Sequence, residues 1–215
     1  KLCFRIYNNG QDNLRAGTPE YVRHAGAKGY TVKGLKGDLW TPYPDDSVFQ
    51  EKLEKFIKAF AKEYDNPDIV DFIDGYSLGW WGECHHVVLQ DQEKFEQVFD
   101  WFTTLYSTHF RRVILALPFG SQIGFNIEKR IAIDGKGYGM RRDGLGSMWF
   151  SDEEKKIVTD MYGKTLLIGE SCYWGCSSDD CTPFRSDTRY QMNSWRDVYE
   201  QTFQHAIEGH FNTLD

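Results

Sequence analysis

The chain has 215 residues, a length that suits one domain, and 40% of them are hydrophobic, which excludes intrinsic disorder. The formal net charge of −7 disfavours nucleic acid as a ligand, because binding to a phosphate backbone calls for a basic surface. No apolar run approaches the roughly 20 residues that span a bilayer, so we do not expect an integral membrane protein.

Aromatic residues make up 16% of the chain, with seven Trp and twelve Tyr. Sugar rings present apolar C–H faces, and flat aromatic side chains fit against them. This composition is therefore typical of a carbohydrate-binding protein. The alternative is a large aromatic core, which needs no ligand.

The first predicted strand covers residues 1–7 and begins with the first residue of the chain. Because Lys1 is not Met and no signal-like segment is present, we interpret the chain as an internal piece or a processed product. Residues 8–46 are polar and Gly-rich, and we expect a functional loop region there, with a short helix near residues 19–24. Ser47 is expected to cap the next helix, whose apolar residues recur on one face through Tyr64.

Strands and helices then alternate to the end of the sequence, which indicates parallel α/β architecture. The predicted strands are residues 69–78, 112–118, 137–142, 165–170 and 211–215. The predicted helices are residues 95–106, a helix opened by the capping box Ser151-x-x-Glu154, and residues 195–208.

These elements predict a single α/β domain over residues 1–215: a (β/α)8 TIM-type barrel of which the chain covers strands 3 to 8 only. The remaining barrel segment would be missing from this chain. The alternative is an open doubly wound sheet. No Gly-rich phosphate loop occurs at a strand–helix junction, so nucleotide binding has no support.

Two predicted strands lead into a glutamate that follows glycine, at Gly82-Glu83 and Gly169-Glu170. Parallel α/β folds place their sites at the carboxyl ends of strands, and hydrolysis of a glycosidic bond needs two carboxyl groups. We therefore predict that Glu83 and Glu170 are catalytic. Alternatively, each glutamate caps a helix or pairs with an arginine.

Aromatic side chains flank both glutamates: Trp80 and Trp81 precede Glu83, while Tyr173 and Trp174 follow Glu170. We expect these rings to bind substrate, or else to belong to the core. Consecutive residues of a regular strand point to opposite faces, so Trp80 and Trp81 can both face the site only if the strand is irregular there.

His85 and His86 lie directly after Glu83 and Cys84. A consecutive Cys-His-His lacks the usual spacing of zinc ligands, so we predict no metal and no cofactor. We expect the histidines to hydrogen-bond a sugar hydroxyl or a catalytic carboxylate.

Arg5, Arg142 and Asp143 are further polar residues at strand ends, and we expect them to bind substrate. The alternative is a structural Arg–Asp pair. No Gly-x-Ser-x-Gly motif is present, which disfavours a serine hydrolase.

Three of the five cysteines, Cys172, Cys176 and Cys181, lie within ten residues of one another in a polar segment. We predict a disulfide within this set, which favours an extracytoplasmic location (periplasmic, cell-surface or secreted).

Residues 79–83, Gly-Trp-Trp-Gly-Glu, followed by His85 and His86, resemble a Trp-Gly-Glu motif of bacterial glycoside-hydrolase-like (β/α)8 barrels, many of them exported. Residues 142–146, Arg-Asp-Gly-Leu-Gly, and residues 168–170, Ile-Gly-Glu, look like later landmarks of that group. The order is similar to the retaining clan whose acid/base ends strand 4 and whose nucleophile ends strand 7.

The resemblance implies a retaining glycoside hydrolase that cleaves an oligo- or polysaccharide, with Glu83 as acid/base and Glu170 as nucleophile. The clan usually has Asn before the strand-4 glutamate, where this chain has Gly82, so another donor must bind the substrate 2-hydroxyl. The alternatives are a non-catalytic carbohydrate-binding barrel and a metal-dependent hydrolase using Cys84, His85 and His86.

Overall fold

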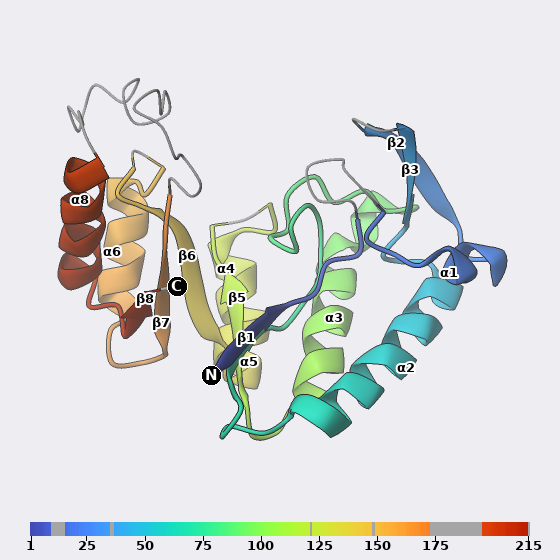
Figure 1. Ribbon diagram of the computed structural model, residues 1–215, viewed down its shortest axis with the longest axis horizontal. Helices are drawn as coiled ribbons and strands as arrows, with labels where there is room; N and C mark the ends of the chain where they lie inside the picture. Colours follow the sequence, from blue (N-terminus) through green and yellow to red (C-terminus); the bar gives the residue numbers. More distant parts are fainter. Residues whose placement is uncertain (10–15, 35–36, 121, 148, 173–194, 215) are drawn as a thin grey trace. The chain divides into compact units, whose positions relative to one another are not determined.

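The computed structural model describes residues 1–9, 16–34, 37–120, 122–147, 149–172 and 195–214. The chain divides into two compact units, residues 1–138 and residues 139–215 (Figure 1). Each unit contains parallel strands together with helices, so the α/β architecture expected from the alternating pattern is confirmed.

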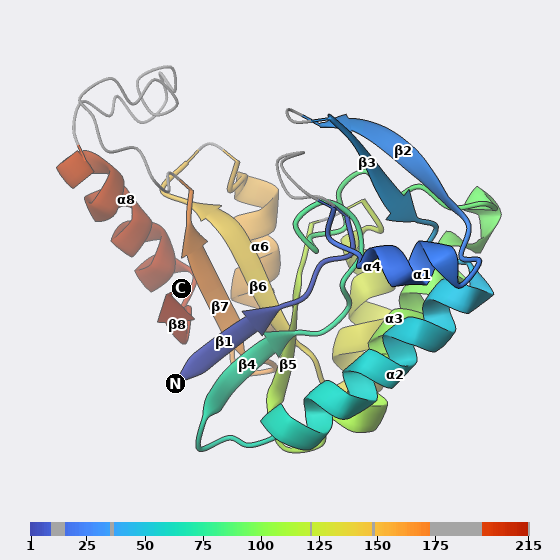
Figure 2. The ribbon, with the colours of Figure 1, turned by 45° about the vertical axis from the view of Figure 1, so that its right-hand side comes forward.

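The first unit is built on three parallel strands, β1 (Leu2–Arg5), β4 (Val70–Asp74) and β5 (Ile114–Pro118), with β4 in the middle (Figure 2). Arg5 of β1 lies directly opposite Asp74 of β4 in this register. Side chains of register partners in parallel strands project from the same face of the sheet. Arg5 and Asp74 therefore share a face.

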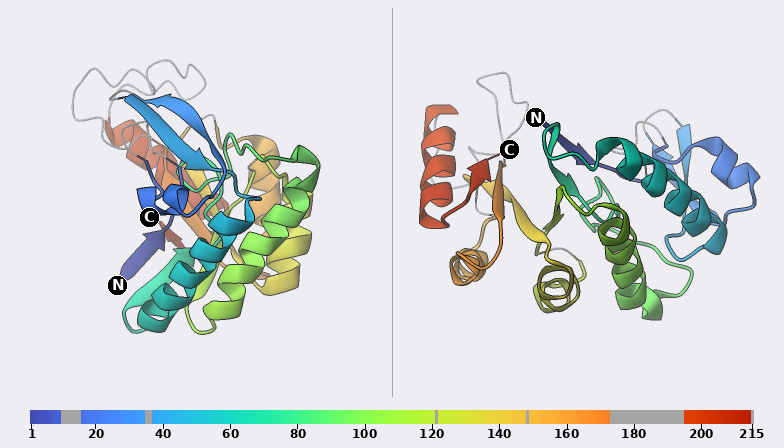
Figure 3. Two further views of the ribbon diagram at one scale, coloured as in Figure 1. Left: turned by 90° about the vertical axis from the view of Figure 1, so that its right-hand side faces the viewer. Right: turned by 90° about the horizontal axis from the view of Figure 1, so that it is seen from below.

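Two long helices, α2 (Ser47–Tyr64) and α3 (Phe95–His109), lie side by side along the first unit (Figure 3). The ring of Phe4 in β1 packs edge-on against Phe60 of α2, with ring centroids 5.1 Å apart. Because neighbouring residues of a strand point to opposite faces, Arg5 projects away from these helices. The face that carries Arg5 and Asp74 is thus opposite the helix layer.

The start of α2 corrects one expectation. Asp46, not Ser47, is the N-cap residue, and its carboxylate accepts a hydrogen bond from the backbone N–H of Phe49 at 2.9 Å. The apolar face of α2 is buried as predicted, through Phe49, Leu53, Ile57 and Ala61.

The region predicted as a long loop contains the expected short helix α1 (Glu20–His24). It also contains an antiparallel hairpin of β2 (Gly29–Gly34) and β3 (Gly37–Pro42), which was not predicted. The first unit is completed by short helical segments, which are η2 (Gln92–Lys94), α4 (Phe125–Glu128), η3 (Lys129–Ile133) and α5 (Asp134–Lys136).

The second unit contains the parallel strands β6 (Gly139–Leu145), β7 (Leu167–Ser171) and β8 (Thr213–Leu214), with β7 in the middle. Helix α6 (Asp152–Met161) follows β6, and α8 (Trp195–Glu208) precedes β8. The capping box at the start of α6 is confirmed, since Ser151 and Glu154 exchange side-chain-to-backbone hydrogen bonds.

The predicted (β/α)8 TIM-type barrel is wrong. The described residues supply six parallel strands, three in each unit, and β8 is only two residues long. The β2–β3 pair forms a separate antiparallel sheet and adds no parallel strand. A closed barrel needs eight parallel strands, so the described part of the chain is an α/β fold without that closure.

Candidate functional site

A cluster of opposite charges lies in the first unit, where β1 and β4 end. Arg5 donates from Nε to Oδ2 of Asp74 at 2.6 Å, and its Nη1 lies 2.5 Å from Oε1 of Glu83. One guanidinium therefore bridges two carboxylates, one from β4 and one from the loop that follows it. Arg5 and Glu83 were predicted from the sequence as site residues, whereas Asp74, which ends β4, was not.

Glu83 lies in a loop whose backbone repeatedly adopts the left-handed region. Ser77, Trp81, Cys84 and His86 have φ values between 50° and 59°, although none of them is glycine. In the described part of the chain, His210 is the one other non-glycine residue with positive φ. Such conformations cost of order 1 kcal/mol or more each and cluster at functional sites.

The glycines of this loop are required by close backbone contact. Gly79 has φ +70°, and a Cβ there would lie 2.4 Å from the carbonyl oxygen of His85. Trp80 and His85 form an isolated antiparallel bridge, in which the Trp80 N–H donates to the His85 carbonyl at 2.8 Å. This bridge closes the loop around Glu83.

Aromatic rings cluster on the same loop. Trp80 and Trp81 stand almost perpendicular, at 86° with centroids 5.7 Å apart, and each packs against one histidine. The ring of His86 lies 4.0 Å from that of Trp80, and the ring of His85 lies 6.0 Å from that of Trp81. Strand β4 ends at Asp74, so the regular alternation that would separate the two tryptophans does not apply here.

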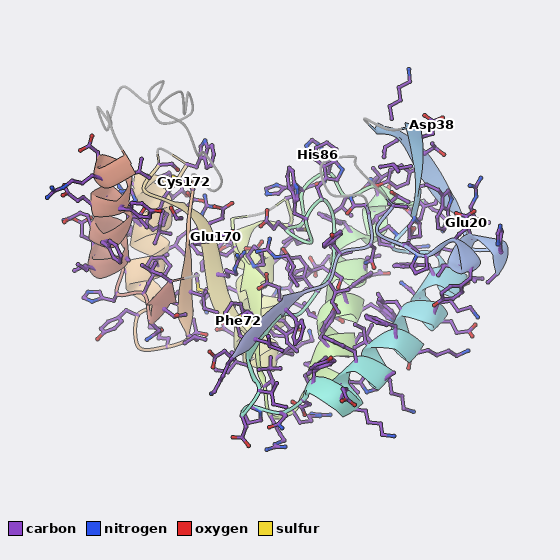
Figure 4. The ribbon with its side chains drawn as sticks, in the orientation of Figure 1. Glu20, Asp38, Phe72, His86, Glu170 and Cys172 are labelled. Atoms are coloured by element: carbon purple, nitrogen blue, oxygen red, sulfur yellow. The ribbon has the colours of Figure 1, made fainter. Side chains whose placement is uncertain are left out.

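His85 is the histidine next to the carboxylate. Its Nε2 lies 3.8 Å from Oε2 of Glu83, while Arg5 contacts Oε1. His86 is exposed and packs on Trp80 instead, and Cys84 is buried. Figure 4 labels His86 in this loop. The three residues of the alternative Cys-His-His metal site thus have three different environments.

Two further buried polar groups of the first unit were missed by sequence analysis. Tyr76 and Glu128 are both fully buried. Burial, together with the nearby charges of Cys84, Glu128, Asp74 and Glu83, raises the pKa of Tyr76 well above its ordinary value, so this hydroxyl stays protonated. Glu128 accepts a hydrogen bond from the backbone N–H of Gly120 at 3.2 Å.

In the second unit, Glu170, labelled in Figure 4, is the penultimate residue of β7. It forms an ion pair with Arg141 of the adjacent strand β6. Arg141 is almost completely buried. Arg141 lies opposite Ile168 in the register, and Ile168 and Glu170 project from the same face of β7. The sheet geometry thus brings Arg141, rather than Arg142, to Glu170.

Arg142, which we predicted as a substrate-binding residue, contacts groups of its own unit. It projects toward α6, where Nη2 lies 2.8 Å from Glu154, and it also donates to the backbone carbonyl groups of Asp143 and Trp149. Asp143 is half-buried on β6. The carboxylate that pairs with Arg142 is thus that of Glu154, and substrate binding by Arg142 and Asp143 stays a prediction.

Four residues named in the sequence analysis, Tyr173, Trp174, Cys176 and Cys181, lie outside the described residues. The substrate-binding role of Tyr173 and Trp174 therefore stays a prediction, as does the disulfide within the set of Cys172, Cys176 and Cys181.

Within the described ranges, no helix is both long enough and apolar enough to cross a membrane. A comparison of the chain with protein-family models, with curated proteins and with solved structures found no significant match.

Proposed function

We propose that the chain is a retaining glycoside hydrolase that cleaves an oligo- or polysaccharide, with Glu83 as general acid/base and Glu170 as nucleophile. The observation that carries the proposal is the setting of Glu83: an acidic residue only 9% exposed, in a backbone-strained loop that also carries two tryptophans and a histidine. Buried charge and backbone strain both lower stability, so their coincidence favours a functional role over a structural one.

The surroundings of the two glutamates suit different roles. The buried guanidinium of Arg141 contacts Glu170 and favours its ionised form, which a nucleophile needs. Glu83 belongs to the loop that carries the Trp81 and His85 rings, and it lies beside His85, a type of side chain that can exchange a proton in the physiological range. Trp80 and Trp81 supply apolar surface for the C–H face of a sugar ring.

The reaction proceeds in two balanced steps. The Glu170 carboxylate attacks the anomeric carbon, the bond to the leaving oxygen breaks, and that oxygen takes the proton of Glu83. Glu83 then removes a proton from water, the resulting hydroxide attacks the anomeric carbon, and Glu170 leaves as a carboxylate. The steps need no cofactor, and we propose that the protein works outside the cytoplasm.

Covalent trapping tests this proposal. The protein would be incubated with a panel of 2-deoxy-2-fluoro glycosides bearing activated leaving groups, and its intact mass would be measured. We expect a mass increase of one fluoroglycosyl group with at least one sugar, located on the peptide that contains Glu170. The Glu170→Gln variant should stay unlabelled, and Glu208→Gln, an exposed glutamate of α8, should label like the wild type.

The rival functions predict other results. A non-catalytic carbohydrate-binding protein would bind glycans in calorimetry but would give neither label nor turnover with any member of the panel. A metal-dependent hydrolase would turn over substrate without a covalent intermediate, and would lose activity on chelation and on His85→Ala substitution.

A further inference from the structure

The general-acid role of Glu83 conflicts with its nearest positive charge. A general acid must hold a proton near neutral pH, but an adjacent guanidinium favours the ionised carboxylate. Arg5 lies 2.5 Å from Glu83, so Arg5 alone would work against proton donation. The structure contains a second carboxylate, Asp74, on the same guanidinium.

We propose that Asp74 is a positioning and charge-balancing residue: it neutralises Arg5, and so allows Glu83 to hold the proton that it donates to the leaving oxygen. This inference rests on the proposed function, because it concerns the acid/base residue of that reaction. It assigns a role to a residue that takes no direct part in the bond-breaking steps.

The strand register makes the Asp74–Arg5 pair the fixed part of the cluster. The two residues are direct register partners in adjacent strands and share a face of the sheet. The Asp74 side chain is 3% exposed and the Arg5 side chain 23% exposed. The pair is part-buried, and its separation would leave the buried carboxylate of Asp74 without this counter-charge, which is unfavourable. Arg5 is therefore held by Asp74 whichever form Glu83 takes.

Glu83 is the member of the cluster that can change its protonation state. It belongs to a loop rather than to a strand, and its side chain is 11% exposed. When Asp74 and Glu83 are both ionised, two negative charges share one positive charge in a poorly solvated place. Like charges at one site raise the proton affinity of one member, and the better solvated, loop-borne carboxylate can exchange its proton with substrate.

Other ionisable groups of the first unit also face this cluster. His85 approaches the second oxygen of Glu83, while Tyr76 and Cys84 are buried beside it. Tyr76 stays neutral at physiological pH, so it contributes no charge there. A protonated His85 would favour the ionised form of Glu83, in the same direction as Arg5 and opposite to Asp74.

Two substitutions test the charge balance in opposite directions. Asp74→Asn removes a negative charge with little change of size, and the pH at which Glu83 is half-ionised should fall by about one pH unit or more. Arg5→Gln removes the positive charge, and the same midpoint should rise. The midpoint would be read by carbon NMR of protein labelled at glutamate side-chain carboxyl groups, with Glu83→Gln used to assign the signal.

Asp71→Asn is the matched control. Asp71 is on the same strand, three residues before Asp74, but its side chain is 57% exposed and pairs with Lys1. The Asp71→Asn substitution removes the same charge from a solvent-exposed position, where screening is strong. The pH at which Glu83 is half-ionised should therefore not change. Circular dichroism would establish that each variant is folded, and if Asp74→Asn does not fold, Arg5→Gln still gives the opposite shift.

The NMR measurement needs no substrate, so it separates this inference from the proposed function. An unchanged Glu83 midpoint in either folded variant overturns the charge balance, even if trapping on Glu170 succeeds. Shifts in the two expected directions support it, even if no sugar labels the protein, in which case only the hydrolase proposal fails. Where a substrate is found, the alkaline limb of kcat/KM against pH should move with the NMR midpoint.

Discussion

Arg141 and Arg142 are neighbours in the sequence but project from opposite faces of β6. Arg141 forms an ion pair with Glu170 of β7, whereas Arg142 lies 2.8 Å from Glu154 of α6. The alternation of a strand separates the two guanidinium groups, so one lies on the helix side and the other on the carboxylate side. This relationship gives the two arginines separable roles.

Methionine substitutions should distinguish these roles. Arg141→Met removes the charge beside the proposed nucleophile, and we expect kcat/KM to fall by about 10- to 100-fold, the equivalent of the ~1.5–3 kcal/mol of a hydrogen bond to a charged group. Arg142→Met should retain most activity and should lower the free energy of unfolding by about 1–3 kcal/mol, because it breaks the half-buried pair with Glu154. Urea denaturation and steady-state kinetics of both variants check this; equal kinetic losses would contradict it.

The pattern of elements could be predicted because it depends on local periodicity. Helix α8 has the predicted bounds, Trp195–Glu208, and the capping box of α6 is present. Whether the sheet closes into a barrel could not be predicted from local patterns. Closure depends on the number of strands that pair, and no single strand carries that information. The hairpin of β2 and β3 was missed because the Gly-rich region around it is typical of a loop.

The candidate site could be predicted in part, because a local pattern also shows which residues end or follow a strand. Glu83, Arg5 and His85 come together because each follows or ends a strand of the first unit. Asp74 and Arg141 were missed, although both belong to predicted strands. The signal that could have identified Arg141 is its position next to Arg142 in a predicted strand. Consecutive residues of a strand point to opposite faces, so only one of the two arginines can share a face with Glu170. Which one does so depends on the register between β6 and β7, and no local pattern gives that register.

Gly79 should be intolerant of a side chain because two costs coincide there. Its φ of +70° is unfavourable for other residues by about 1–2 kcal/mol, and a Cβ would also meet the His85 carbonyl at 2.4 Å. We expect Gly79→Ala to destabilise the first unit by on the order of 3 kcal/mol or more.

Gly26→Ala is the control in the same unit. Gly26 also has positive φ, at +99°, but no atom lies within 4 Å of the position that an alanine methyl group would occupy. Only the backbone cost of about 1–2 kcal/mol therefore applies. Thermal and urea unfolding of both variants would be compared. Equal losses would mean that the Trp80–His85 bridge closes less tightly than the distances imply.

The second unit should lose stability in mild acid because of His205. This imidazole is buried, and its Nδ1 accepts a hydrogen bond from the Gly146 N–H at 3.0 Å. Burial, and secondarily the charge of Lys155, lower the pKa of His205 to about 4. The unfolded chain, with an ordinary value near 6.5, therefore binds more protons between pH 4 and pH 6.5. Stability is unaffected by this group above pH 6.5 and falls as the pH is lowered through that window.

The expected loss from His205 is on the order of 2–3 kcal/mol between pH 7 and pH 4. Unfolding of the wild type would be measured by urea titration across this range and compared with His205→Gln, which cannot be protonated there. Carboxylates contribute equally to both proteins, so the difference between the two curves isolates His205. Parallel curves would contradict the assignment.

The proposed catalytic roles of Glu83 and Glu170 predict that substitution of each residue has a different effect on activity. Glu170→Ala should abolish turnover of every substrate, because it removes the nucleophile. Glu83→Ala should slow the hydrolysis of substrates with poor leaving groups by about 10²–10⁴-fold, the usual contribution of general acid–base catalysis. The first step with activated aryl glycosides should be affected far less, because an activated leaving group departs without protonation.

Azide distinguishes the two variants further. In Glu83→Ala the glycosyl–Glu170 intermediate forms but is hydrolysed slowly, since no base activates water. Azide needs no base, so it should attack the anomeric carbon, release Glu170 and give a glycosyl azide of retained configuration. In Glu170→Ala azide can only replace the missing nucleophile, and the product should have inverted configuration. Proton NMR of the products shows their configuration directly. A glycosyl azide of inverted configuration from Glu83→Ala would exchange the two roles. If azide restores activity to neither variant, a carbohydrate-binding protein without catalysis is favoured.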